Sequence, residues 1–459
     1  MKDLATIIEE QRESIIDAIT RWIKIPSVKS AATDNAPFGE EVRKALETAL
    51  TDAETMGFTV RNFDNYVGDV SMGPTGVDPF AILAHLDVVP VGDGWTVDPF
   101  GAEIQGDKIY GRGTSDDKGP AIAALFAMKA VADAGIPLRR EVRLILGCDE
   151  ESGWDCMKHY KEHCDMPKTG FSPDASFPII NTEKGMLGLN LTAPYCNEGL
   201  CIEKINVGER PNVIPGIATA LIKGDDALIE KANALASDMC VDVKCEKVED
   251  GMFEMVSTGI PGHSAYPEHA KNAIGQLLLM LRALGAKGAI KTMANCVGME
   301  YNGAGLGVQC SDHTSGPLTC NLGILRYDAQ NGLFANLDIR YPILINQDAL
   351  EKTIVAALGT DITVKVRSSK KPHHVAPNST LVTMLLDAYH EVTDRPRECI
   401  ATGGGTYARC LEEGVAFGSA FPEDEELAHQ AGEYLSIEGI MTNVRIFARA
   451  IEKLCGVKS

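Results

Sequence analysis

The sequence predicts an α/β protein in which one domain, with a mostly parallel sheet flanked by helices, is interrupted by an inserted α+β domain. In the first 184 residues, short apolar runs alternate with helix-like segments, a rhythm typical of a parallel sheet covered by helices. Composition then shifts to short strands mixed with helices, and long helical patterns return near the end. A chain of 459 residues is also too long for one ordinary core. We therefore expect one domain at residues 1–184 and 380–459, interrupted by an inserted domain at residues 185–379.

The elements of the first part follow from the spacing of apolar residues. Helical spacing from Leu4 to Trp22 predicts an N-terminal helix. Further along, we expect helices at residues 37–56 and 119–134 and strands at residues 80–85 and 142–146. Because ligands of open parallel sheets lie beyond the carboxyl ends of the strands, the residues at the ends of these two strands are candidates for a site.

The remaining elements place the insertion between two pieces of one domain. Helices are predicted at residues 218–236, 272–284 and 347–358, and a strand at residues 334–340. After Pro377 the pattern becomes helical again, with helices expected at residues 379–393 and 437–454.

The composition argues against nucleic acid and membranes as binding partners and indicates a cellular location. The chain is 45% hydrophobic and 23% charged, as in an ordinary globular protein, and its formal net charge of -21 argues against nucleic acid. It has no apolar signal core at its start and no apolar run long enough for a bilayer, so we expect no membrane partner. Thirteen scattered cysteines without a Cys-x-x-Cys pair favour reduced thiols and a cytoplasmic location.

Polar residues follow both buried strands. Glu150 and Glu151 are adjacent, so both reach one site only from a loop after the strand. His85 and Asp87, two residues apart, are placed on the other strand facing the same side. Histidine is a good zinc ligand, and a nearby carboxylate commonly holds its other ring nitrogen. Ordinary hydrogen bonds at a strand end and solvated glutamates are the alternative interpretations.

Asp116 and Asp117 stand just before the helix predicted at residues 119–134. Helix N-capping is the structural alternative for Asp117. The surrounding glycines, in Gly111-Arg-Gly113 and Lys118-Gly119, indicate instead an irregular turn with a functional purpose.

Asp174, after Pro173, and His429, after an acidic run, would each be called structural if taken alone. Together, histidines and carboxylates at strand ends and loops are what a two-metal hydrolytic site needs: one carboxylate bridges the ions and another stays off them to act as base. Cys148 is a rival, because a thiol beside the glutamates could be a nucleophile.

Two residues of the insertion and one stretch of the catalytic metal-binding domain (residues 1–184 and 380–459) suit substrate binding. We therefore expect residues 185–379 to form a lid that binds substrate. His263 could donate to an oxyanion if that domain folds over the site, and the guanidinium of Arg340 suits a planar carboxylate. Backbone N–H groups of Gly403, Gly404, Gly405 and Thr406 could hold an anion, but the lysine and spacing of a phosphate loop are missing, which excludes nucleotide binding.

Taken together, these motifs resemble the M20 family of metallopeptidases, and most of all the PepV-type bacterial dipeptidases, of the Xaa-His or carnosinase-like kind. The resemblance covers nearly the whole length. It is carried by His85-Leu-Asp87 and by residues 111–119, 149–154, 171–178, 209–212, 262–265, 338–342, 403–409 and 421–430.

The resemblance implies a role for each matching residue. Two divalent ions per chain are expected, zinc or alternatively manganese or cobalt. His85 and Asp174 would bind one ion, Glu151 and His429 the other, and Asp116 would bridge them. Glu150 would be the general base and Asp87 the support of His85. Asn212, His263 and Arg340 would bind substrate, with His263 stabilising the oxyanion.

The implied reaction is hydrolysis of a dipeptide with a free N-terminus by a metal-activated water. Deacylation of N-acyl amino acids, cleavage of longer peptides, and non-catalytic metal or peptide binding are the alternatives. The resemblance also implies a cis peptide between Asp116 and Asp117. The insertion is the size of a whole domain. The resemblance therefore implies that His263 acts in the site of its own chain and that the protein acts as a monomer.

Overall fold

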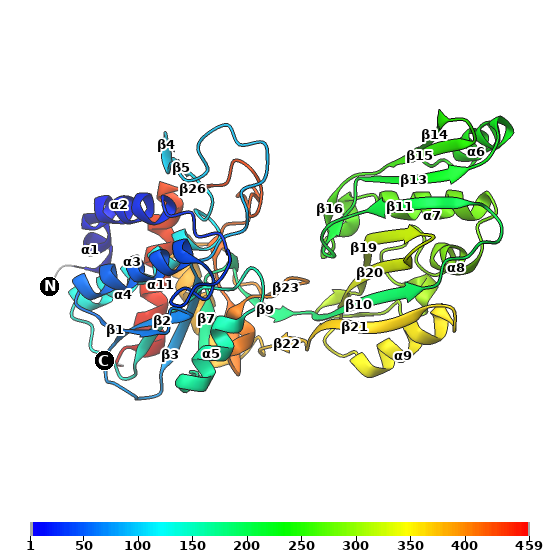
Figure 1. The fold of residues 1–459 in the computed structure, drawn as a ribbon. Coiled ribbons are helices and arrows are strands. Elements are labelled where there is room, and N and C mark those ends of the chain that lie inside the picture. Colours follow the sequence, from blue (N-terminus) through cyan, green and yellow to red (C-terminus); the bar gives the residue numbers. More distant parts are fainter. Residues whose placement is uncertain (1–2, 458–459) are drawn as a thin grey trace. The chain divides into compact units, whose positions relative to one another are not determined.

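The structure is a computed structural model that describes residues 3–457 (Figure 1). The chain divides into two compact units. Unit 1 comprises the chain up to residue 181 together with residues 375–400 and those from 405 onward, and unit 2 comprises residues 182–374 and 401–404. Helices and strands mix in both, so the predicted α/β class is confirmed.

Unit 1 is built on a twisted sheet whose central strands run parallel. Its strand order is β1-β2-β6-β3-β7-β24, and the pairs β6–β3, β3–β7 and β7–β24 are parallel. All residues of β3 and β6 are buried, so both faces of the sheet are covered, as parallel sheets require. The helices are α1 (Leu4–Glu10), α2 (Arg12–Ile23), α3 (Glu40–Thr55), α4 (Lys118–Asp133), α5 (Asp155–His163), α10 (Thr380–Thr393) and α11 (Ile437–Cys455). The strands are β1 (Thr59–Phe63), β2 (Val67–Met72), β3 (Phe80–His85), β4 (Glu103–Gln105), β5 (Lys108–Tyr110), β6 (Val142–Gly147), β7 (Thr169–Ser172), β8 (Ala175–Ser176), β24 (Glu413–Ala416), β25 (Ser419–Ala420) and β26 (Tyr434–Ser436).

Helix α4 is apolar on nearly all sides because it lies inside the core of unit 1. This helix packs against α2, α11 and the sheet, and nearly all of its residues are buried. Its many alanines allow this close packing on several sides. Within the described residues, no helix is long and apolar enough to cross a membrane.

Unit 2 is an antiparallel sheet with helices packed against it (Figure 1). The strand order is β14-β15-β13-β11-β19-β20-β10-β21. Burial alternates along β13, which indicates one face in the core and one facing outward. The strands are β10 (Gly185–Ala193), β11 (Ile202–Val207), β12 (Val213–Ile214), β13 (Ile217–Lys223), β14 (Val243–Glu249), β15 (Met252–Thr258), β16 (Gly262–His263), β17 (Ser311–Asp312), β18 (Gly316–Pro317), β19 (Thr319–Asp328), β20 (Gly332–Tyr341), β21 (Thr363–Lys370) and β22 (His373–His374). The helices are α6 (Asp226–Asp238), α7 (Ala273–Ala283), α8 (Gly288–Cys296) and α9 (Gln347–Leu358). The strands β9 (Ile180–Glu183) and β23 (Ile400–Thr402) each contain one of the four boundaries between the units.

One predicted element is wrong. The helix expected at residues 218–236 is a strand in its first part, because residues 217–223 form β13 and α6 begins only at Asp226. Gly224 separates the two, and the carboxylate of Asp225 caps α6 by accepting from the N–H of Leu228. Similarly, the N-terminal helix is two helices that meet at Gln11.

Candidate active site

Two neighbouring parallel strands bring the first candidate residues together. β3 and β6 pair so that His85 lies opposite Gly147, and each is the last residue of its strand. Asp87 lies two residues beyond β3, so its placement on the strand was wrong. Glu150 and Glu151 lie in the loop after β6, as predicted. All these side chains therefore lie at the carboxyl edge of the sheet, where α/β proteins bind ligands.

Asp116 lies between two histidines. Its Oδ1 is 2.9 Å from Nε2 of His85, and its Oδ2 is 2.9 Å from Nε2 of His429. The same nitrogen of His429 is 3.0 Å from Oε1 of Glu151. Asp174, in the segment after β7, places Oδ2 3.8 Å from Nε2 of His85. The fold thus gathers all five predicted metal ligands, although they are spread over most of the chain.

The donor atoms form two overlapping sets. The atoms of His85, Asp116 and Glu151 lie within 4.8 Å of one another, and so do those of His85, Glu150 and Asp174. Nδ1 of His85 donates to the backbone oxygen of Asp87 at 2.9 Å, because a carbonyl can only accept. In the neutral ring this leaves Nε2, the nitrogen that faces the carboxylates, with a lone pair for a metal.

Asp87 does more than face His85. Its two carboxylate oxygens accept from the backbone N–H groups of Glu150 and Glu151 at 3.1 and 3.2 Å, and Oδ1 is 3.6 Å from Nδ1 of His85. The side chain is buried. It therefore holds the loop that carries both glutamates against the end of β3.

Asp117 occupies the N-cap position of α4, but its side chain makes no capping hydrogen bond. Its Oδ2 accepts instead from the backbone N–H of His85 at 3.0 Å. The capping alternative is thus wrong for this carboxylate, which ties the loop to the end of β3. The peptide between Asp116 and Asp117 is cis, so this prediction is confirmed.

A buried residue that the sequence interpretation missed holds the loop before Asp116. Oε1 of Glu433 accepts from the N–H groups of Gly113 and Ser115, at 3.0 and 2.9 Å, and from that of Asp116 at 3.3 Å. Its Oε2 accepts from Arg112 at 2.5 Å. Gly113 has a φ of 92°, a conformation that glycine adopts at low cost. The carboxylate therefore organises a loop whose glycine permits an unusual bend.

The electrostatics of the cluster reflect an excess of carboxylates. Burial is the largest influence on His85 and opposes its charge, but the hydrogen bonds to Asp116 and Asp87 and the charges of Asp174 and Asp116 together outweigh burial and raise the pKa of the imidazole. Burial also disfavours ionised Asp116, yet the hydrogen bonds from His429 and His85 hold its pKa low. Burial and the charge of Asp116 raise the pKa of both Glu151 and Asp174. A divalent cation would offset this repulsion, and imidazole nitrogens with carboxylate oxygens suit zinc, manganese or cobalt, so the residues fit such ions.

Cys148 does not have the surroundings of a nucleophile. Its side chain is fully buried, and burial together with the nearby Cys156 raises the pKa of the thiol well above its usual value. A thiol that stays protonated is a poor nucleophile, so the rival interpretation loses its basis.

Within unit 2, Asn212 and His263 lie on adjacent segments. His263 pairs with Val213, the residue after Asn212, in the short β12–β16 ladder. The backbone oxygen of Asn212 accepts from the N–H of Ser264 at 2.9 Å. Nδ1 of His263 accepts from the N–H of Ala265 at 3.3 Å, which directs the other ring nitrogen away from the turn.

Arg340 and Gly403 are also in contact within unit 2. The guanidinium donates to Oδ2 of Asp338 at 2.8 and 3.0 Å and to the backbone oxygen of Gly403 at 2.9 Å. A Cβ on Gly403 would lie 2.9 Å from that of Ala265, so the position accepts only glycine without a shift. The N–H of Gly404 donates to Thr402 Oγ1 at 2.9 Å. This N–H group was expected to donate to an anion, and in the structure it donates to a side chain instead.

The other two residues of this stretch belong to unit 1. The chain re-enters that unit at Gly405. Thr406 precedes a short 3₁₀ helix (Tyr407–Cys410), and its Oγ1 accepts from the N–H of Ala408 at 3.2 Å. The backbone groups of residues 403–406 are therefore divided between the two units.

A cluster of histidines and carboxylates at the carboxyl edge of a parallel sheet defines the class as a metal-dependent hydrolase. Residues 81–453 match the model of peptidase family M20/M25/M40, and the chain belongs to this family. It is therefore a metallopeptidase.

The relatives and solved structures agree with this family. The chain is 37% identical over 457 residues to the Bacillus subtilis protein named "Putative dipeptidase YtjP", covering 97% of this chain and 98% of the relative. A Staphylococcus aureus protein, SAR1836, carries the same description and is 32% identical over 469 residues, covering 98% of each chain. The structure of the dipeptidase Dug1p from Saccharomyces cerevisiae matches with a TM-score of 0.60 at 14% identity, over 98% of this chain and 97% of that one. At that identity the match shows the fold.

Proposed function

We propose that this chain hydrolyses dipeptides with a free N-terminus, with two divalent metal ions and a glutamate general base. The observation that carries the proposal is Asp116, whose two carboxylate oxygens each contact a different histidine, His85 and His429, at 2.9 Å. A carboxylate so placed suits a bridge between two ions. The names of the relatives, which describe them as dipeptidases, support the substrate class.

In this proposal His85 and Asp174 hold one ion, Glu151 and His429 hold the other, and Asp116 bridges them. Zinc is the ion we favour, with manganese and cobalt as alternatives. When bound, the ions lower the pKa of a coordinated water and polarise the scissile carbonyl. We also propose that the protein acts as a monomer in the cytoplasm. The cysteines, all unpaired, support the location because they suit a reducing compartment.

Glu150 is the proposed base. One of its carboxylate oxygens lies within 4.8 Å of donor atoms of His85 and Asp174. A base beside these two proposed ligands could take a proton from a water bound to the ion that they hold. It then passes the proton to the leaving amine. Asp87 positions Glu150 through the backbone N–H. We assign His263, Asn212 and Arg340 to substrate binding, and His263 to donation toward the developing oxyanion.

Replacing Glu150 tests the mechanism. Glu150→Gln removes the proton acceptor without removing any of the five proposed ligands, so we expect unchanged metal content and turnover reduced by about 10²–10⁴-fold or more. Glu13→Gln, an exposed substitution on α2, is the matched control. Normal turnover with full metal content would exclude Glu150 as the base.

Two further functions remain in competition. N-acyl amino acids or longer peptides are substrates of the same chemistry, and a free dipeptide assayed beside its N-acetylated form and a tripeptide separates them. A non-catalytic binder of metal or peptide would turn over none of the three with any metal ion added.

A further inference from the structure

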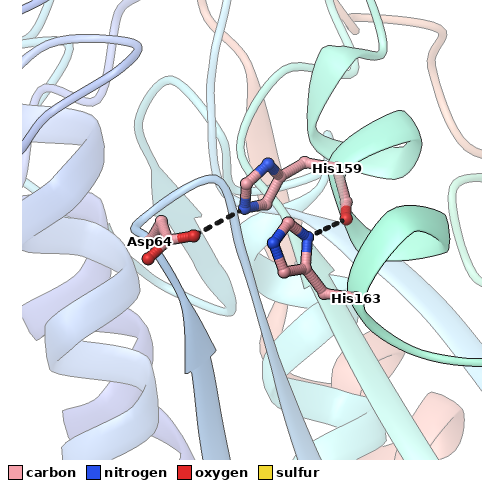
Figure 2. Close-up of side chains that lie close together, drawn as sticks. All are labelled: Asp64, His159 and His163. Atoms are coloured by element: carbon pink, nitrogen blue, oxygen red, sulfur yellow. Dashed lines mark hydrogen bonds and ion pairs between the residues drawn. The ribbon is translucent and has the colours of Figure 1, made fainter.

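We infer that unit 1 holds an additional transition-metal site, outside the candidate active site, formed by Asp64, His159 and His163. The three side chains come from the β1–β2 turn and from α5 (Figure 2). One donor atom from each lies within 4.8 Å of the other two. None of the three has a role in the proposed function, and the inference does not depend on it.

The two histidines are arranged by the helix. They are four residues apart on α5, so they lie on one face, one turn apart. Their ring centroids are 4.1 Å apart, with the planes inclined by 32°. Two imidazoles at this spacing can bind one ion without any change in the backbone.

The hydrogen bond made by His163 suits a metal ligand. Its Nδ1 lies 2.8 Å from the backbone oxygen of His159 and must donate to it, because the carbonyl only accepts. In the neutral ring Nε2 then carries the lone pair, and a carbonyl partner on the other nitrogen is the usual support of a metal-binding histidine. Figure 2 shows Nδ1 of His163 directed to that oxygen and the opposite ring nitrogen on the side of Asp64.

His159 and Asp64 are held from the hairpin side. The His159 ring stacks on Tyr66 at 4.2 Å between centroids, with an interplanar angle of 15°, and its Nε2 is 2.9 Å from Oδ2 of Asp64. Asp64 and Asn65 both have positive φ, and the N–H of Tyr66 donates to the oxygen of Phe63, so they form the tight turn of the hairpin. The Asp64 side chain is 71% exposed, which leaves room for an ion and its water.

The donor set selects the class of ion. Two imidazole nitrogens and one carboxylate oxygen suit zinc, copper or nickel, and disfavour magnesium and calcium, which prefer oxygen alone. Three protein ligands and a water complete a tetrahedral zinc shell. The bound ion would tie the β1–β2 turn to the end of α5. The first residue of this helix, Asp155, donates its N–H to Asp149, which precedes Glu150 and Glu151.

Metal content of the full-length protein tests the site. Wild-type protein and variants are equilibrated with micromolar free zinc, exchanged into zinc-free buffer and analysed by mass spectrometry of the metal. His163→Gln should bind one equivalent of zinc fewer than wild type. His313→Gln, which changes an exposed histidine of unit 2, should bind as much as wild type. Asp116→Asn, which changes the candidate active site, should keep the equivalent that His163→Gln loses, so failure of the proposed function would leave this result unchanged.

Hydrogen exchange gives a second measurement. On addition of zinc, exchange in residues 59–72 and 155–163 should slow in wild type and not in His163→Gln. Equal zinc content in wild type and His163→Gln would overturn the inference. An equal loss in His313→Gln would overturn it as well, because it would indicate unspecific binding by surface histidines.

Discussion

The carboxylate of Glu433 is predicted to stabilise unit 1 by several kcal/mol through one buried ion pair and the backbone of one loop. Glu433→Ala would leave the guanidinium of Arg112, 1% exposed, without its carboxylate partner. It would also remove the acceptor for the N–H groups of Gly113, Ser115 and Asp116. Removing one partner of a buried pair costs about 3–5 kcal/mol. We take this range without adding the lost hydrogen bonds, because water can enter the space that the side chain leaves.

The assay is urea unfolding followed by circular dichroism, with a chelator present so that metal binding does not contribute to the free energy of unfolding. Glu423→Ala is the matched control, because its ion pair with Arg395 is exposed and should contribute about 0.2–1 kcal/mol. Glu433→Gln keeps the side-chain volume and one acceptor oxygen. It should therefore lower the free energy of unfolding by less than Glu433→Ala and by more than Glu423→Ala. If Glu433→Ala lowered the free energy of unfolding no more than Glu423→Ala, the argument from burial would be refuted.

Two further predictions concern the cluster itself. Asp87→Asn replaces one of the two acceptor oxygens with an N–H₂ group that faces a backbone N–H of Glu150 or Glu151. This change should lower kcat by about 10–100-fold with little change in KM. An unchanged kcat would show that the Asp87 carboxylate does not position the loop. Chelation should abolish hydrolysis and lower the urea midpoint, and added zinc should restore both; activity that survives complete metal removal would contradict a metal-dependent reaction.

Strands buried on both faces could be predicted from the sequence almost to the residue. Residues 80–84 are an uninterrupted apolar run, and residues 142–146 are apolar except for Arg143. The loop position of Glu150 and Glu151 followed from the end of the second run. The segment from residue 218 was harder, because its alanines and leucine suit a helix. It became a strand because it pairs with neighbours on both sides in the sheet, a non-local effect that local spacing does not contain.

In the candidate site, too, some residues could be predicted from their local sequence and others are brought into place only by the fold. His85, Glu150 and Glu151 stand near strand ends and Asp116 in a glycine-rich turn, and that context made them candidates. Asp174 and His429 carried no such local signal, and their roles came from the family resemblance. Glu433 lies far along the chain from the loop it holds, and an isolated glutamate carries no local signal of burial. The sequence interpretation did not single out the His-x-x-x-His spacing at residues 159 and 163, and the third partner, Asp64, is a turn residue brought near only by folding.

The last prediction concerns which chain His263 serves. We propose that it acts on the chain that carries it, since the segment from Gly185 to Ser379 is large enough to replace a neighbouring subunit. Glu150→Gln and His263→Ala are each expected to be inactive, and they are co-expressed so that any dimers form at random. If His263 acted across a dimer, half of the dimers would contain both variants, and one site in each would combine an intact Glu150 with an intact His263. Recovered activity would then be about a quarter of the wild-type value. A chain that is complete by itself should recover none, so activity near a quarter would refute the monomer.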